Sequence, residues 1–223
     1  MTHPAVTRIL AIRHGETAWN VDSRIQGHLD IPLNAVGREQ ARRLALSVAG
    51  EDLTAIYCSD LSRAHATASA VAESVGLPLS VDKGLRERSF GAFEGLSFKE
   101  IEQRWPDQAL RWRQRDPLFA AEGGENLQTF YARCVGAVRV LAERHAGEHI
   151  AVVAHGGVMD CLYRAASRLE LHAPRSWELG NASINRLLYM PEGFTLVGWN
   201  DKSHLEGPAL DEFSDGEREG LTT

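Results

Sequence analysis

Short continuous apolar runs alternate with amphipathic stretches along most of the chain. Continuous apolar runs bounded by polar residues or glycine are typical of strands that are buried on both faces of a parallel sheet. Such runs stand at residues 9–12, 55–58 and 150–154. Apolar residues at helical spacing occupy residues 37–48, 61–75, 127–144 and 158–169. The alternation of strand and helix predicts right-handed crossovers in a largely parallel sheet.

Two segments lack this regular alternation. Residues 19–33 are polar and rich in turns, which predicts an ordered loop after the first strand. Residues 98–115 contain two short helical patterns, which Pro106 interrupts. We interpret this stretch as the centre of a short helical lid inserted at about residues 96–123.

The last part of the chain ends in a hairpin pattern and an acidic tail. Residues 184–189 and 195–199 flank Pro191-Glu192-Gly193, an arrangement typical of a hairpin or of adjacent edge strands. From residue 205 to residue 223 the chain is acidic and rich in glycine, so we expect a flexible tail. We predict a single α/β domain over residues 1–204, a three-layer sandwich in which helices cover both faces of a largely parallel central sheet.

Composition limits the class of protein and its partners. The chain has 223 residues, of which 43% are hydrophobic, enough for a core without disulfide staples. A net charge of -6 argues against a general affinity for nucleic acid or anionic membranes. There is no stretch of about 18 apolar residues to span a membrane, and the first residues lack a signal-peptide pattern. The three cysteines form no C-x-x-C pair and fit reduced core positions, so we expect a cytoplasmic protein.

Two histidines directly follow predicted strands. Arg13 and His14 follow the first apolar run, and His155 follows the last. Ligands in open α/β sheets bind beyond the carboxyl ends of the strands, so both rings should face one crevice. Imidazole is nucleophilic near neutral pH, and arginine offers a planar fork of donors to phosphate oxygens. Arg63, in the predicted first turn of the next helix, should bring a second cation to this edge.

Each of these residues also has a structural interpretation. Taken alone, His14 is more often a buried structural histidine than a catalytic one, and His155 fits either role equally well. Arg63 also fits a solvated position, although a cation in the first turn of a helix opposes the helix dipole. Such local conflicts are expected at functional positions, so the combination favours a site for an anionic substrate.

Five blocks of sequence surround these residues in an order that matches a known family. They are Arg13-His14-Gly15-Glu16-Thr17-Ala18-Trp19-Asn20 with Gln26-Gly27, Ser59-Asp60-Leu61-Ser62-Arg63-Ala64, Leu85-Arg86-Glu87 with Phe90-Gly91, Glu94-Gly95 with Gly124-Glu125, and Ala154-His155-Gly156. Within residues 9–199 the chain therefore resembles the histidine phosphatase superfamily, in its phosphoglycerate-mutase-like branch.

The resemblance implies a role for each matched residue. His14 is implied as the nucleophile that takes the phosphoryl group. Glu87 is implied as the acid that protonates the leaving oxygen and then as the base that activates water. The phosphate pocket is implied to contain Arg13, Arg63, His155, Asn20, Gln26, Gly27 and Gly156. No metal or other cofactor is implied.

The resemblance implies a phosphomonoester hydrolase that acts through a phosphohistidine on small phosphorylated metabolites. One alternative is a phosphoglycerate mutase, which exchanges 3- and 2-phosphoglycerate and needs 2,3-bisphosphoglycerate as a primer. Mutases of the family carry a longer lid with paired arginines and tyrosines. In this chain the lid segment, residues 96–123, is short and contains no tyrosine. We therefore favour the phosphatase. A second alternative is a catalytically silent relative that binds phosphorylated ligands, which would not need Glu87.

Other features leave alternatives open. Arg111, Arg113 and Arg115 either grip an anionic substrate or form a solvated helix face. His145 and His149 lie four residues apart, but a glycine between them interrupts the helix, so we expect no metal site. The expected partner is a small phosphorylated substrate, and the sequence does not decide whether the chain forms a homodimer.

Overall fold

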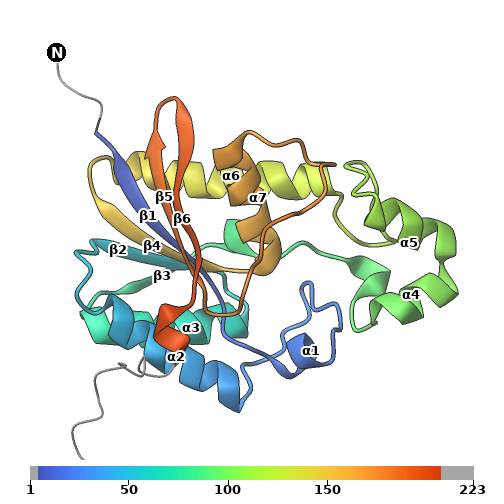
Figure 1. Ribbon diagram of the computed structural model, residues 1–223, viewed down its shortest axis with the longest axis horizontal. Coiled ribbons are helices and arrows are strands. Elements are labelled where there is room, and N and C mark those ends of the chain that lie inside the picture. The colour runs from blue at the N-terminus through green and yellow to red at the C-terminus, as the bar shows by residue number, and fades with distance from the viewer. Residues whose placement is uncertain (1–4, 207–223) are drawn as a thin grey trace, which may run out of the picture.

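The computed structural model describes residues 5–206, which contain one six-stranded sheet (Figure 1). The strands are β1 (Thr7–Arg13), β2 (Ala55–Cys58), β3 (Leu79–Val81), β4 (His149–Ala154), β5 (Ile184–Met190) and β6 (Gly193–Asp201). Their order in the sheet is β3-β2-β4-β1-β5-β6. Strands β3, β2, β4 and β1 are parallel to one another, whereas β5 is antiparallel to both β1 and β6. The sheet is thus largely parallel, and the predicted hairpin is the β5–β6 pair.

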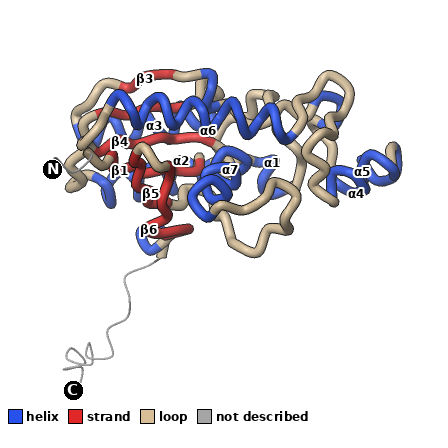
Figure 2. The backbone as a smooth tube through the Cα atoms, turned by 90° about the horizontal axis from the view of Figure 1, so that it is seen from above, coloured by secondary structure: helices blue, strands red, loops and turns tan. Residues whose placement is uncertain are grey.

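Helices cover both faces of this sheet. They are α1 (Ala18–Val21), α2 (Ala35–Val48), α3 (Ser62–Val75), α4 (Phe98–Arg104), α5 (Pro106–Arg113), α6 (Leu127–Arg144) and α7 (Gly156–Ser167), with 3₁₀ turns at Lys83–Leu85, Gly91–Phe93 and Ser203–Leu205. Helices α2 and α3 pack on one face, and α6 and α7 pack on the other (Figures 1 and 2). The predicted three-layer α/β sandwich is confirmed.

Alternate residues of the central strands face the two helical layers. In β1, Ile9 packs in the core beneath α6 and α7, whereas Leu10 packs in the core beneath α2 and α3. In β4, Val152 and Val153 divide in the same way. Burial on both faces explains why these strands are continuous apolar runs instead of alternating ones.

Helices α4 and α5 project beyond the end of the sheet, where the lid was predicted (Figure 1). They enclose a small core of their own, in which the rings of Phe93 and Phe119 lie 6.0 Å apart. Pro106 begins α5, a position where its missing N–H removes no helical hydrogen bond. The interruption predicted at this residue is therefore the boundary between the two lid helices.

Several helix boundaries differ from the sequence prediction, and two of the differences lie next to the site. The sequence predicts a loop from residue 19 onward, whereas Trp19 lies in the one-turn helix α1. Reciprocal hydrogen bonds between Thr17 and Asn20 close a capping box that stabilises this turn. Helix α7 begins at Gly156 instead of residue 158, because the extended backbone of His155 ends immediately before it. The amides of two glycines therefore form the start of α7.

Most of the predicted acidic tail, residues 207–223, lies outside the described residues. Leu205 ends a 3₁₀ turn, and its carbonyl accepts a hydrogen bond from Arg43 of α2 at 3.2 Å. Among the described residues, no helix is both long enough and apolar enough to cross a membrane. The predicted core cysteines, Cys58, Cys134 and Cys161, are free and buried.

Two glycines allow the loop after β1 to approach the first turn of α2. A Cβ atom on Gly37 would collide with the carbonyl oxygen of Glu16, and one on Gly15 would lie 2.5 Å from the carbonyl oxygen of Gly37. Both obstacles are backbone atoms, which cannot move aside as a flexible side chain can. This approach fixes the residues that follow His14.

We expect Gly37→Ala to lower the free energy of unfolding by about 1–3 kcal/mol, because the new methyl group must displace backbone. Gly136→Ala is the matched control. Gly136 lies inside α6, and a methyl group added there would have nothing within 4 Å, so this change should stabilise the fold by about 0.5–1 kcal/mol. Urea unfolding followed by circular dichroism measures both, and a Gly37→Ala protein as stable as the wild type would contradict the packing argument.

Candidate active site

Two histidine rings meet at the carboxyl edge of the sheet. Strands β1 and β4 are neighbours that end in register, with Arg13 opposite Ala154. The next residues are His14 and His155, whose ring centroids lie 5.3 Å apart in an edge-to-face arrangement. Both rings are buried. Parallel pairing thus brings together two residues that are distant in sequence.

Arg63 reaches the same edge from the start of α3, which follows β2. Its side chain is almost fully buried, at 1% exposure. One amino group, Nη1, donates to the carbonyl of Leu29 at 3.0 Å, and the other, Nη2, donates to the carbonyl of Gly27 at 2.8 Å. The loop at residues 26–29 therefore fixes the guanidinium, while its Nε has no partner among the described residues.

Arg13 is held from the opposite side. Its Nη1 donates to the carbonyl of Leu179, in the loop between α7 and β5. The buried Nε of Arg13 and both ring nitrogens of His155 lack a partner in the described part of the chain. Buried polar atoms almost always have partners. The unpaired atoms of Arg13, Arg63 and His155 near the His14 ring therefore indicate a binding site for a polar ligand.

The tautomer of His14 follows from its backbone contact. Its Nδ1 lies 2.7 Å from the carbonyl oxygen of Gly15, and a carbonyl can only accept. Nδ1 therefore carries the proton, and Nε2 keeps its lone pair. The hydroxyl of Thr67 accepts from the amide of Gly15 at 3.0 Å and donates to the carbonyl of Arg63 at 2.8 Å, which ties this loop to α3.

Burial and positive charge keep both rings neutral. Burial, and then the charges of Arg63 and Arg13, lower the pKa of His14 well below its usual range. The pKa of His155 is lowered in the same way, first by burial and next by Arg63. Burial also lowers the pKa of Arg13 to about 10, against the opposing charge of Glu87. At neutral pH the site thus contains two uncharged imidazoles between two cations.

Glu87 is anchored beside the start of α7. Its Oε2 accepts from the amide of Gly157 at 2.9 Å, and its Oε1 accepts from the amide of Arg88 at 2.8 Å. The backbone carbonyl of Glu87 is held by Nη2 of Arg133 at 3.2 Å and by Nε2 of His28 at 2.8 Å. These contacts fix both the carboxylate and the chain that carries it.

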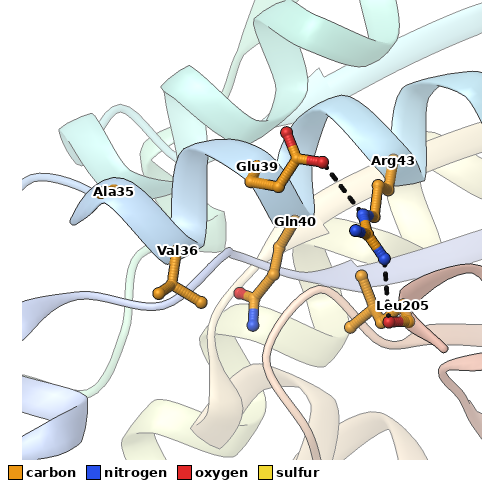
Figure 3. A pocket seen from close by; sticks show the side chains of 6 residues that line it. All are labelled: Ala35, Val36, Glu39, Gln40, Arg43 and Leu205. Carbon is orange, nitrogen blue, oxygen red and sulfur yellow. Dashed lines mark hydrogen bonds and ion pairs between the residues drawn. The ribbon is translucent and has the colours of Figure 1, made fainter. Parts of the chain in front are cut away.

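Glu87 lines a cavity of about 220 Å³ between the lid and α7, which we call the Glu87 cavity. Its lining includes Glu87, Arg88, Trp112, Arg115, Gly156 and Arg175. A larger hollow of about 480 Å³ lies along α2 beside Leu205 (Figure 3). There Arg43 pairs with Glu39 and with the carbonyl of Leu205, and none of the predicted site residues lines it (Figure 3). Of the predicted site residues, Glu87 and Gly156 line the Glu87 cavity, which makes it the candidate site for the part of the substrate next to the phosphoryl group.

The other predicted site residues lie in the loops that surround this edge. Nδ2 of Asn181 donates to the carbonyl of His14 at 3.1 Å and to Oδ1 of Asn20 at 3.2 Å. Gln26 is buried with its Oε1 unpaired, and it precedes the carbonyl that binds Arg63. Within the described residues, no hydrogen bond joins Asn20 or Gln26 to either histidine ring. Their place in the phosphate pocket stays a prediction.

The lid arginines separate into two kinds. Arg111 pairs with Asp116 and Arg113 pairs with Glu102, each at 2.7 Å and at the surface of the lid. Arg115 instead lines the Glu87 cavity. Of the two roles left open by the sequence, the first pair fits a solvated face, and only Arg115 reaches the cavity.

No metal site is found in the described part of the chain. No group of three or more His, Cys, Asp or Glu side chains there is arranged to hold an ion. His145 instead lies 2.8 Å from the hydroxyl of Tyr57. His149 begins β4, so the two residues lie in different elements.

Several contacts come from a segment that no sequence motif marks. Leu179, Asn181 and Arg175 all lie between α7 and β5, where residues 168–183 show neither helical nor strand periodicity. Arg133 is recognisable in the sequence only as a member of the long amphipathic helix. The polar residues and turn residues of this segment predict a loop. They do not predict which of its groups face the site.

Comparison with known proteins agrees with this geometry. The histidine phosphatase superfamily (branch 1) matches residues 9–202. The chain is 39% identical over 202 residues to phosphoglycerate mutase-like protein 4 of Arabidopsis thaliana, covering 89% of this chain and 86% of that protein. It is 34% identical over 203 residues to a metal-independent phosphoserine phosphatase of the same plant, covering 90% and 84%.

Solved structures give the same result. A mycobacterial glucosyl-3-phosphoglycerate phosphatase superimposes with a TM-score of 0.77 at 34% identity, covering 86% of this chain and 98% of that one. YhfR of Bacillus stearothermophilus superimposes with a TM-score of 0.84 at 34% identity, covering 90% and 100%. The resemblance inferred from the sequence blocks is confirmed, and the chain belongs to the histidine phosphatase superfamily.

Proposed function

We propose that this protein hydrolyses phosphomonoesters of small metabolites through a phosphohistidine at His14. The observation that carries the proposal is the neutral His14 ring among buried, unpaired polar atoms of Arg13, Arg63 and His155. A tetrahedral phosphoryl group supplies oxygens to such donors. Relatives named as phosphatases of phosphoserine and of glucosyl-3-phosphoglycerate support hydrolysis.

In the first step, Nε2 of His14 attacks phosphorus, so that a P–N bond forms while the ester P–O bond breaks. The Nδ1 proton remains on the ring, hydrogen-bonded to the carbonyl of Gly15, which stabilises the positive charge that develops there. The guanidinium groups of Arg13 and Arg63 stabilise charge on the equatorial oxygens. Glu87, in its protonated form, donates its proton to the leaving oxygen.

In the second step, the carboxylate of Glu87 takes a proton from water. The water oxygen attacks phosphorus, the P–N bond breaks, and His14 returns to its neutral form as phosphate leaves. The anchoring amides of Arg88 and Gly157 keep the carboxylate in one place for both proton transfers. One carboxyl group on the cavity wall thus serves leaving group and water in turn.

The mutase alternative differs in the fate of the phosphoryl group. A mutase returns it to a substrate hydroxyl and excludes water meanwhile. A relative from Yersinia enterocolitica that is 35% identical is named probable phosphoglycerate mutase GpmB. The lid favours hydrolysis, because Arg111 and Arg113 are neutralised by ion pairs within the lid.

We further infer a cytoplasmic enzyme that needs no metal and folds as one domain with its lid. The free, buried cysteines fit a reducing compartment. The phosphoserine phosphatase relative is named metal-independent, and the lid packs next to the Glu87 cavity through Trp112.

Replacing His14 by Ala should abolish turnover, because the variant lacks the nitrogen that attacks phosphorus. Free phosphate is measured with a panel of phosphomonoesters, and 2-phosphoglycerate is measured from 3-phosphoglycerate with 2,3-bisphosphoglycerate. His65→Ala, on the exposed side of α3, is the control. Undiminished hydrolysis by the His14 variant would exclude the mechanism. Primer-dependent isomerisation by the wild type would identify a mutase. Binding of phosphomonoesters by the wild type without turnover would identify a catalytically silent relative.

Replacing Glu87 by Gln should slow phosphoenzyme formation by about 10²- to 10⁴-fold, the usual contribution of a general acid. The amide oxygen can accept from only one of the two anchoring backbone groups, Arg88 or Gly157, so circular dichroism of the variant is needed to show that the fold persists. The loss should be smaller for p-nitrophenyl phosphate, whose leaving oxygen needs little protonation, than for an alkyl phosphate. Rapid-quench kinetics measure the step, and equal losses for both esters would exclude Glu87 as the acid.

The stability of the protein should fall as the pH drops through 6.5, the usual pKa of histidine. The unfolded chain takes up protons there, whereas the buried rings do not, so protons favour the unfolded state. Between about pH 7.5 and about pH 5.5, His155→Asn should reduce this loss by about 1.4 kcal/mol. Urea unfolding at both pH values measures it, with exposed His65→Asn as the control. A loss as large in His155→Asn as in the wild type would show that this ring titrates freely.

A further inference from the structure

The Glu87 cavity meets the phosphate site at Gly156, where an added Cβ atom would lie 3.5 Å from Nε of Arg13, and it reaches the lid at Trp112 and Arg115. At about 220 Å³ it is smaller than the roughly 300–1,000 Å³ typical of drug-sized ligand pockets, so it suits a small metabolite. Beyond Glu87 its wall carries apolar rings and three arginines. The arginines are Arg88, Arg115 and Arg175. An arginine without a protein partner is free to bind an anionic group of a ligand, so the partners of each arginine matter.

Two of these arginines already have partners. Arg88 is buried, and it donates through Nε and Nη2 to the carbonyls of Glu125 at 2.7 Å and Phe119 at 2.8 Å. Arg115 pairs with Asp160 at 2.7 Å and donates from Nε to the carbonyl of Leu171 at 2.9 Å. Asp160 also pairs with Arg164 at 3.0 Å, so Arg115 shares its carboxylate partner, and the donors of Arg88 are held by protein carbonyls.

Arg175 is different. It lines the cavity as an exposed residue, and it makes no hydrogen bond or ion pair with any residue between 5 and 206. Its positive charge, after burial, is among the effects that lower the pKa of Arg13, so the two guanidinium groups lie within electrostatic reach of one another. An unpaired cation on a cavity wall attracts an anion, and a guanidinium binds carboxylate or phosphate oxygens in a bidentate manner.

The loop that carries Arg175 is fixed on both sides of this residue. Trp177 stacks on Tyr163 of α7 with ring centroids 3.9 Å apart, and it lies 4.9 Å from the guanidinium of Arg164. On the other side, the carbonyl of Leu171 is bound by Arg115. Arg175 is therefore presented to the cavity by an ordered loop.

We propose that Arg175 is a specificity residue that binds a second anionic group of the substrate, away from the phosphoryl group that is transferred. The inference rests on the proposed phosphatase function. The positive charges of Arg13 and Arg63 serve the phosphoryl group, so the charge of Arg175 is left for another part of the molecule. The substrate is thus a small phosphomonoester that also carries a carboxylate or a second phosphate.

Matched pairs of substrates test this directly. O-Phospho-L-serine and O-phosphoethanolamine differ by a carboxylate, and propane-1,3-diyl bisphosphate and propyl phosphate differ by a second phosphate. Within each pair, kcat/KM is measured for the wild type, Arg175→Gln, Arg175→Lys and Arg144→Gln. Arg144, exposed in the last turn of α6, controls for the loss of one positive charge.

We expect the wild type to prefer the ester with the extra anion in one pair. Arg175→Gln should lower that preference about tenfold or more, the usual value of a charged hydrogen bond. Arg175→Lys should restore part of it, and Arg144→Gln should leave it unchanged. The pair that responds identifies the second anion as a carboxylate or a phosphate.

Two other outcomes separate the claims. A wild type that hydrolyses none of these esters, nor p-nitrophenyl phosphate, overturns the proposed function itself. A wild type that hydrolyses them, with the same preference in Arg175→Gln as in the wild type, overturns only the role of Arg175. The same holds if Arg144→Gln lowers the preference as much as Arg175→Gln does.

Discussion

The site depends on the burial of two guanidinium groups beside two uncharged imidazoles. Moving a cation out of water is costly unless its N–H groups find acceptors. Here the acceptors are backbone carbonyls, those of Gly27 and Leu29 for Arg63 and that of Leu179 for Arg13. Each cation therefore fixes a loop, and each loop orients a cation. Loop conformation and site electrostatics cannot change independently in this protein.

The same burial determines the chemistry. An imidazole that attacks phosphorus must be neutral, and the environment that lowers the pKa of His14 also positions the charges that, in the proposed mechanism, stabilise the transferred phosphoryl group. Protonation of this ring or of His155 would add a third or fourth positive charge to a buried space. A nucleophile that is ready at neutral pH is thus obtained together with lower stability at low pH.

The sequence predicted the parts of the site that regular structure positions. His14 and His155 follow continuous apolar runs, and parallel pairing of such strands brings their carboxyl ends to one edge. Arg63 could be placed because it lies in the first turn of the helix that follows β2. These inferences needed only strand type and strand direction, which hydrophobic periodicity reports. The one-turn helix α1 was not predicted, because its stability comes from a local capping box and not from periodicity.

The segment between α7 and β5 could not be predicted in this way. Its conformation is set by tertiary contacts, chiefly the stacking of Trp177 on Tyr163 and the bond from Arg115 to the carbonyl of Leu171. Arg111 and Arg115 look alike in the sequence, and only their partners in space distinguish a lid surface residue from a cavity residue. The motif blocks therefore report the phosphoryl chemistry, which rests on the sheet edge. Contacts to the rest of the substrate depend on loops, where function commonly varies on a shared scaffold.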